Sequence, residues 1–377
     1  MNYTSFFALL ILLFTLSCSS SRQINTASNF SFFVGTSTDT ASEGIYAYTL
    51  NTETGEVTLK SQTENITNAS FLTISPDNRF LYALERKKGA TENSVNAYSI
   101  SKDLSLTLRN QQSTEGNGAC YISTSKMGDE VLIAHYTGGS ITHLPVQSDG
   151  SLAKAATVIQ HEGSSINTER QNSPHAHFIR QGFDDLIYAA DLGMDKVMLY
   201  ELEEGKLQAA QPAFLDLPKG AGPRHISFHP NGKFLYVMNE LSGSVSLFTF
   251  DQKARTFEMQ QTISSLPEGF DDFNGSADIH VHPSGKFLYA SNRGDHDSIA
   301  AYKIDEKTGR LSLIEIEQET IVWPRNFAIS PDGKYLLCGN QKDDTISIFK
   351  IDSSTGALTF TGQRIEVPKP MCVQFMN

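Results

Sequence analysis

Apolar and polar residues alternate with a period of two through most of the chain after residue 20. This period predicts β-strands, because successive side chains of a strand point to opposite faces of a sheet. A typical run is SVSLFTF at residues 244–250, and a typical hairpin turn is Pro-Asn-Gly at residues 230–232. The 3.6-residue period of an amphipathic helix is absent there, so we expect an all-β protein.

One unit recurs along the chain. The sequences ISPDNRFLY (74–82), VHPSGKFLY (281–289) and ISPDGKYLL (329–337) share a strand end, a turn and an apolar triplet. The triplets end at residues 34, 82, 133, 188, 236, 289 and 337, at intervals of 48 to 55 residues. Each interval has room for four short antiparallel strands, so the repeat predicts a seven-bladed β-propeller.

The two ends of the chain complement each other. The first copy, FFV at residues 32–34, lacks the half that precedes the turn in the other copies. The segment CVQF at residues 372–375 has the pattern of an inner strand. We therefore expect the N- and C-terminal strands to pair in one blade, which closes the ring and removes its free edges.

The N-terminus carries an apolar run of 11 residues, FFALLILLFTL at 6–16, which is too short to span a bilayer. With Cys18 and three serines after it, the run resembles the signal of a bacterial lipoprotein, in which this cysteine is lipidated. An uncleaved signal anchor or a misread start are alternatives, since the first basic residue is Arg22. We expect a signal peptide (1–18), a Ser-rich tether (19–29) and a propeller (30–377), exported and held in the cell envelope, periplasmic or at the outer membrane, only by its lipid.

Charge and cysteine content narrow the partners. The 377 residues include 30 basic and 42 acidic ones, for a net charge of −12, so we expect no nucleic acid partner.

Three cysteines, Cys120, Cys338 and Cys372, remain when Cys18 is set aside as the lipidated residue. Their odd number excludes a disulfide framework and allows at most one pair; three small buried strand residues are the simpler interpretation.

Polar groups flank the hairpin at residues 222–240, with Arg224 and His225 before it and Glu240 after it. The start of the first strand and the end of the second lie at the same edge of an antiparallel hairpin, so these side chains should lie close together. Positions at the same distances from the apolar triplets of the other blades should lie at the same edge, which predicts one polar rim around a mouth of the central channel. Its further members are Ala176, His177, Ala277, Asp278, Arg325, Asn326, Glu85, Arg86, His135, Asp191, Asn239, Asn292, Arg293, Asn340 and Gln341.

Most of these positions have a simple structural interpretation. A polar residue at a strand end is commonly a solvated turn, which we favour for Glu85, Arg86, Asp191, Gln341 and His135. Asparagines there commonly form turns, which we favour for Asn239, Asn292 and Asn340. His229 and His282 precede turns at the opposite face, where we expect no chemistry.

The segments Arg224-His225-Ile226, Asn239-Glu240 and Ser291-Asn292-Arg293, with Ser-Pro-Asp-Gly-Lys turns, resemble the 6-phosphogluconolactonase-like propeller family. Fungal muconate-lactonising enzymes are relatives of this family, and the resemblance extends from about residue 30 to the C-terminus. It implies a catalytic set of one His, two Arg and one Glu on the rim. By position these are His177 (alternatively His175), Arg224, Arg293 and Glu240. Further substrate-binding candidates are Arg325, which shares the frame of Arg224, and His225, Asn292 and Asp191, with Trp323 as an apolar wall.

The resemblance implies a lactonase, a carboxylic ester hydrolase acting on a small, anionic sugar-derived lactone. Glu240 or His177 would take a proton from water, and Arg224 or Arg293 would hold the oxyanion. The remaining arginine and Arg325 would bind an anionic substituent. We expect no cofactor and no metal; the alternative, Ca²⁺ or Mg²⁺ on Glu240, Asn292 and Asp191, would be repelled by the arginines.

Other functions remain open at this point. No Gly-x-Ser-x-Gly elbow occurs at a strand-to-helix turn, which disfavours a serine nucleophile. A lipid-anchored propeller could bind a ligand or a protein without catalysis, because fold does not dictate function. A lactone-forming cycloisomerase would use the same rim in reverse. Export favours an unphosphorylated aldonolactone or uronic lactone over 6-phosphogluconolactone, which is an intracellular metabolite.

Overall fold

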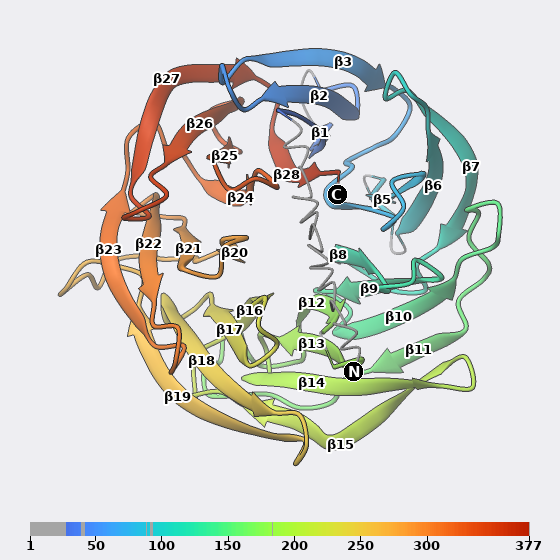
Figure 1. Ribbon diagram of the computed structural model, residues 1–377. Coiled ribbons are helices and arrows are strands. Elements are labelled where there is room, and N and C mark those ends of the chain that lie inside the picture. The colour runs from blue at the N-terminus through green and yellow to red at the C-terminus, as the bar shows by residue number, and fades with distance from the viewer. Residues whose placement is uncertain (1–27, 39–41, 88, 91–92, 183, 377) are drawn as a thin grey trace, which may run out of the picture.

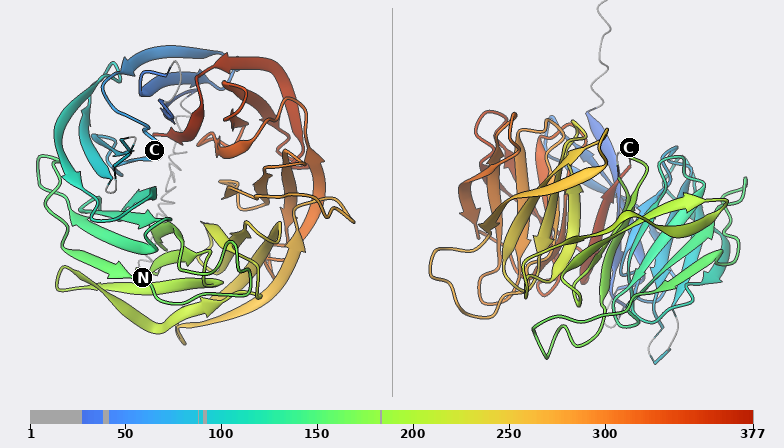
Figure 2. Two further views of the ribbon diagram at one scale, coloured as in Figure 1. Left: turned by 180° about the vertical axis from the view of Figure 1, so that it is seen from behind. Right: turned by 90° about the horizontal axis from the view of Figure 1, so that it is seen from below.

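A computed structural model describes residues 28–38, 42–87, 89–90, 93–182 and 184–376. Strands are the only long regular elements of this part of the chain, and they form seven four-stranded sheets arranged around an axis (Figure 1). Figure 2 shows the same ring from behind and from below. A search of the described residues finds no helix with the length and apolarity needed to cross a membrane. The predicted seven-bladed all-β propeller is confirmed.

Each blade consists of four antiparallel strands, which follow one another from the channel to the outer edge. The first three blades are β28 (Pro370–Phe375), β1 (Asn29–Thr36), β2 (Ile45–Asn51), β3 (Val57–Thr63); β4 (Leu72–Ile74), β5 (Phe80–Glu85), β6 (Ser94–Ile100), β7 (Leu106–Ser113); and β8 (Ala119–Thr124), β9 (Glu130–His135), β10 (Ser140–Pro145), β11 (Thr157–Gln160). The next two are β12 (Ala176–Gln181), β13 (Ile187–Asp191), β14 (Lys196–Glu203), β15 (Lys206–Asp216); and β16 (Pro223–Phe228), β17 (Phe234–Asn239), β18 (Ser244–Asp251), β19 (Thr256–Ser264). The last two are β20 (Ile279–Val281), β21 (Phe287–Asn292), β22 (Ser298–Ile304), β23 (Leu311–Glu317); and β24 (Pro324–Ile329), β25 (Tyr335–Asn340), β26 (Thr345–Ile351), β27 (Leu358–Glu366).

The ring is closed by the two ends of the chain. Strand β28 is the inner strand of the blade that contains β1, and the two pair antiparallel with Phe32 opposite Phe375 and Val34 opposite Val373. The predicted closure is therefore confirmed. The predicted signal peptide and nearly all of the tether fall on residues 1–27, outside the described residues, and β1 begins at Asn29.

The core lies between neighbouring blades. One cluster joins Phe178 and Tyr188 of one blade to Ile226 and Val237 of the next, and all four side chains are buried. Consecutive buried residues, as in β17, point alternately to the two faces of the sheet, so every blade packs on two neighbours. This packing fixes the inner strands around the channel.

Hydrogen bonds at the turn-bearing face add to this packing. His229 Nε2 lies 2.8 Å from the carbonyl oxygen of Gly285 in the next blade, and His282 Nε2 lies 2.8 Å from that of Gly333. A carbonyl can only accept, so each ring donates there. Both glycines have positive φ, and a Cβ at Gly333 would lie 2.4 Å from the ring of His282. The two histidines thus link the turns of adjacent blades.

Candidate active site

Five inner strands carry a β-bulge near the channel mouth. In β28 the extra residue is the apolar Met371, between Pro370 and Cys372. In the other four strands the pairing with the second strand skips one residue between Ala119 and Tyr121, Ala176 and Phe178, Pro223 and His225, and Pro324 and Asn326. A bulge redirects the side chain of the extra residue. The extra residues of these four strands, which we call the upper layer, are Cys120, His177, Arg224 and Arg325.

The bulges correct the count by fixed offsets. That count aligned His177 with His225, whereas the bulge aligns His177 with Arg224. The reason is a hairpin that is one residue shorter, because Tyr188 pairs with Arg180 eight positions before it and Tyr236 pairs with Ser227 nine positions before it. The shared frame of Arg224 and Arg325 is confirmed.

Glu240 lies at the centre of a cluster of arginines. Arg224 Nε is 2.9 Å from Glu240 Oε2, without the alignment of a hydrogen bond, and Arg293 Nη2 is 3.4 Å from the same oxygen. Arg170, from the loop between β11 and β12, donates to Glu240 Oε1 at 2.7 Å. The chain thus brings together Arg224, Glu240 and Arg293, which the sequence predicted for one rim, and adds Arg170.

The environment of Glu240 fixes its charge. Burial on its own would raise the pKa of this carboxyl, but the charges of Arg293 and Arg224 and the hydrogen bond from Arg170 lower it to about 2. Glu240 is therefore ionised throughout the neutral range, and it is a weak proton acceptor. Its contacts suit it to hold three guanidinium groups in place.

Arg325 adds a further positive charge at the mouth of the channel. In the described part of the chain, its side chain has no ion-pair or hydrogen-bond partner. Burial and the charge of Arg224 lower its pKa to about 10, which still leaves it protonated at neutral pH. Arg170, Arg224 and Arg293 share Glu240 as ion-pair partner and Arg325 adds a fourth positive charge, so the cluster has an excess of positive charge.

The two candidate histidines differ in their surroundings. His177 is buried, and its pKa lies well below the usual value because of burial and then the charge of Arg224. It is therefore neutral at neutral pH. His175 is half-buried and stacks on Tyr136 with ring centroids 4.5 Å apart. Its Nδ1 lies 2.8 Å from the carbonyl oxygen of Tyr136 and donates to it, because a carbonyl can only accept.

A second layer of side chains lies beneath the upper layer. His225 Nδ1 donates to Asp278 Oδ1 at 2.7 Å, and His225 Nε2 is 3.4 Å from Arg224 Nη1. Burial and then Arg224 lower the pKa of His225 to about 4. The ring of His225 also contacts Tyr121, with centroids 5.1 Å apart. His225 is thus a buried neutral support for Arg224, with little surface for a substrate.

Asn292 and Asp191 do not have the free groups that substrate binding requires. Asn292 is fully buried, donates to Ser265 O and Ser298 Oγ, and accepts from Ser265 Oγ and Ser276 Oγ. Asp191 is also fully buried; it accepts from the backbone of His175 and lies 2.6 Å from His161 Nδ1. Both side chains stabilise the fold around the site through these hydrogen bonds, and Asp191 orients His175. With Glu240 held by arginines, these three residues offer no shared cation site.

Arg170 is the member of the cluster that the sequence did not predict. It also donates to the hydroxyl of Tyr136 at 3.1 Å. Asp278 and Asn326, which the sequence placed on the rim, are buried, and Asp278 binds both His225 and Asn326 Nδ2. Arg170 comes from a polar loop outside the repeating unit, so counting positions along the repeat could not place it. Trp323 lies under the guanidinium of Arg293, 5.9 Å from its ring centroid. Cys120, Cys338 and Cys372 are free thiols in strands, and Cys120 is only half-buried.

Fold and cluster together give a β-propeller with an arginine-rich cluster in its central channel. The model of the family described as lactonase, 7-bladed beta-propeller, matches residues 31–375, so the chain belongs to this family of hydrolases. It is 35% identical to the 6-phosphogluconolactonase of Bacillus subtilis over 92% of this chain and 98% of that protein. It is 36% identical to that of Formosa agariphila over 89% and 96%. The structure of the Pseudomonas aeruginosa periplasmic gluconolactonase PpgL has a TM-score of 0.87 at 33% identity, over 93% of this chain and 99% of that one.

Proposed function

We propose that this lactonase hydrolyses a sugar-derived lactone that carries an anionic group, in the arginine-rich mouth of its channel. The observation that carries the proposal is the set of four arginines with one carboxylate between them, next to a neutral histidine. The relatives from B. subtilis and F. agariphila are 6-phosphogluconolactonases and the one from P. aeruginosa is a gluconolactonase, so the lactones in their names share one ring.

The proposed mechanism begins with His177. Its neutral imidazole takes a proton from water while the water oxygen forms a bond to the lactone carbonyl carbon. Arg224, held by Glu240, faces the oxyanion that develops on the carbonyl oxygen. The bond from this carbon to the ring oxygen then breaks, and the leaving oxygen receives the proton from His177. Arg325 binds the anionic substituent through its planar fork.

Substrate binding also supports the choice of base. The low pKa of His177 results from burial and from the charges of Arg224 and Arg325. An anionic substrate between these arginines offsets their charge and raises the pKa of His177 toward its usual range. His177 is then a stronger base in the complex than in the free protein. Glu240, with its pKa near 2, orients arginines in this mechanism and does not take the proton.

The experiment is a pH-stat assay on glucono-δ-lactone and on its 6-phosphate, with the spontaneous rate in buffer subtracted. We expect both lactones to be hydrolysed, with a higher kcat/KM for the 6-phosphate because of the unpaired Arg325. Rates equal to buffer on both lactones would overturn the proposal. Hydrolysis with no preference for the anionic lactone would keep the reaction and remove the anion site.

We further propose that the chain is exported and lipid-anchored at Cys18. The apolar run at residues 6–16 and the position of Cys18 support this, as does the periplasmic relative from P. aeruginosa. In cells fed radiolabelled palmitate, the chain should become labelled and partition with membranes, and Cys18→Ser should abolish both. The variant Cys338→Ser is the control for loss of a thiol, since Cys338 lies in the propeller. Equal labelling of the chain and Cys18→Ser would contradict the anchor.

A further inference from the structure

Aromatic side chains of four neighbouring blades form a cluster below the upper layer. Tyr121 packs against Phe71 and Phe178 with ring centroids 4.5 Å apart in both cases. All three also contact the ring of His225, at 5.1 to 6.1 Å. We call Phe71, Tyr121, Phe178 and His225 the partition; it contacts the upper layer where His225 Nε2 lies 3.4 Å from Arg224 Nη1.

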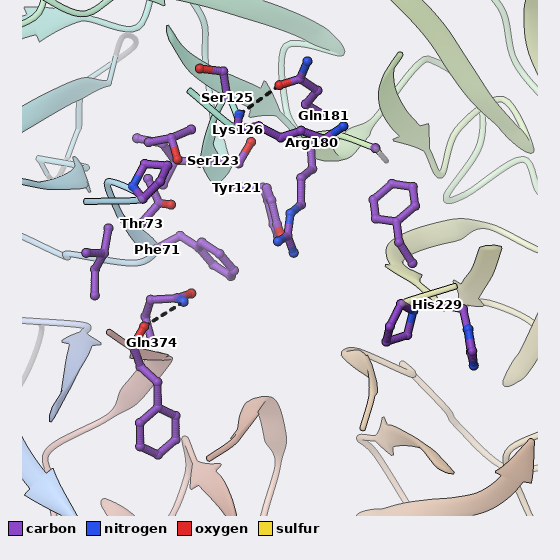
Figure 3. A pocket seen from close by; sticks show the side chains of 18 residues that line it. Phe71, Thr73, Tyr121, Ser123, Ser125, Lys126, Arg180, Gln181, His229 and Gln374 are labelled. Carbon is purple, nitrogen blue, oxygen red and sulfur yellow. Dashed lines mark hydrogen bonds between the residues drawn. The ribbon is translucent and has the colours of Figure 1, made fainter. Parts of the chain in front are cut away.

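A pocket of about 430 Å³ lies on the far side of this partition (Figure 3). Residues two positions further along the inner strands reach into it, because side chains i and i+2 of a strand point to the same side. They include Thr73 after Phe71, Ser123 after Tyr121, and Arg180 after Phe178. Gln374 of β28 is another lining residue. The volume is in the range of about 300–1,000 Å³ that is usual for small-molecule sites.

Arg180 gives this far pocket a cation without a protein partner. In the described part of the chain no carboxylate lies within ion-pair distance of its guanidinium, and the pocket lining contains neither Asp nor Glu. Lys126, also in the lining, is paired with Asp185 at 3.2 Å. Arg180 is therefore the charge that an incoming anion would meet, in a chain whose net charge is −12.

Hydroxyl and aromatic groups surround this cation. Figure 3 shows Tyr121 and Arg180 both directed into the pocket. Burial raises the pKa of Tyr121, and the charge of Arg180 acts in the opposite direction, so the two groups are close enough to interact. The Tyr121 hydroxyl makes no hydrogen bond within the described residues, and Phe71 adds an aromatic wall. Donors, acceptors and apolar faces of this kind suit the hydroxyls and the C–H surface of a sugar acid.

We propose that the far pocket is a second, non-catalytic site, which binds a small hydroxylated carboxylate through Arg180 and Tyr121. The guanidinium fork takes the carboxylate, and the polar groups of the wall take hydroxyls of the ligand. The site does not depend on the proposed reaction, because its lining contains no residue of the upper layer and none of the clustered arginines. Its ligand also contacts the partition residues that support Arg224 from below.

The test is a local binding measurement without turnover. The ¹⁹F signal of 3-fluorotyrosine incorporated at Tyr121 in the full chain is followed during titration with D-gluconate. We expect a saturable shift with D-gluconate and none with D-glucose, which has no carboxylate. Arg180→Gln should weaken binding roughly tenfold or more, the loss expected for a charge-assisted pair.

Two matched variants locate the response. Lys126→Gln removes a lining cation that is already paired, and it should change the affinity less than about twofold. Arg325→Gln removes a cation on the other side of the partition and should likewise leave the titration unchanged. A response that is not saturable, persists in Arg180→Gln, is equal for D-glucose or vanishes in Arg325→Gln would overturn the second site. Each of these outcomes is independent of whether the chain hydrolyses lactones.

Discussion

Single residues decide what the channel mouth can do, and Glu240 has the largest role. Glu240→Gln keeps the shape of the side chain but removes the charge that holds three guanidinium groups. We expect kcat/KM for a lactone to fall about 10²–10³-fold, as when an oxyanion donor is lost. Glu85→Gln is a matched control, because Glu85 is a buried carboxylate at a strand end that binds amides and hydroxyls. Equal activity of both variants would contradict the role given to Glu240.

Arg325 should decide between anionic and neutral substrates. Arg325→Gln removes the unpaired cation of the upper layer, so kcat/KM for the 6-phosphate of gluconolactone should fall roughly tenfold or more. The value for the neutral lactone should change much less. Arg86→Gln is the control, since Arg86 is an exposed arginine of the rim without an ion pair in the described residues. A loss of the same size for both lactones would remove Arg325 from substrate selection.

The choice between the two histidines is also testable at this scale. His177→Gln should lower kcat about 10²–10⁴-fold if His177 is the base, and His175→Gln should have a smaller effect. Because the pKa of His177 is lowered, the free protein keeps the neutral base below pH ~6.5, and kcat/KM should decline only as pH falls well past that value. The pH profile of the chain and the rates of both variants give the measurement. A larger loss in His175→Gln would transfer the role.

At the scale of strands and hairpins, the sequence predicted the pairing but not the direction of each side chain. The repeat showed which strand ends meet, so Arg224 and Glu240 were expected together, as the structure has them. It could not show the bulges, because each follows the first paired residue of its inner strand, so almost no strand residues precede it to reveal a shift of the alternation. The bulges decide that Arg224 and His177 belong to the same layer and that His225 lies beneath them. Asn292 was misplaced because a strand-end asparagine looks the same from the sequence whether it is exposed or buried.

Hydrogen bonds between adjacent blades lead to a prediction about the stability of the fold. The hydroxyls of Tyr82, Tyr236 and Tyr289 each donate to the carbonyl of a glycine in the next blade, Gly150, Gly309 and Gly356. Tyr236→Phe removes one such buried bond, and we expect the free energy of unfolding to fall by about 1 kcal/mol in a urea titration. Tyr48→Phe should have a smaller effect, because that hydroxyl makes no hydrogen bond within the described residues. Equal losses would show that the inter-blade bonds add nothing.

For the whole molecule, ring closure is the feature that the sequence predicted best and the one on which the channel depends. The seven regularly spaced triplets and the matching half-copies at the two ends are properties of the entire chain, so they survive errors at single positions. The loop that carries Arg170 has no such redundancy. The charges that the ring gathers in its channel also connect the site to the stability of the entire fold.

Acid should therefore destabilise the molecule in two stages. Burial lowers the pKa of His135 and of His225 to about 4 from 6.5, with Arg224 adding to the effect at His225. Between these values the unfolded chain binds protons that the folded one does not, so their contribution is complete above pH ~6.5 and is lost as pH falls toward 4. Each histidine should contribute a slope of about 1.4 kcal/mol per pH unit within that window. Glu240, with a pKa lowered from 4.5 to about 2, has its contribution complete above 4.5 and loses it as pH falls toward 2.

Urea midpoints measured across this range separate the two stages. His135 is buried and binds Ser140, away from the arginine cluster, so His135→Gln is the variant that probes the first stage without altering the site. It should lower stability at neutral pH and reduce the slope between pH ~6.5 and ~4 by the share of one histidine. Glu240→Gln should instead change only the slope below pH ~4.5, because it removes the carboxylate that must be protonated there. If His135→Gln kept the full slope of the parent chain, His135 would not be one of the groups that titrate in this window.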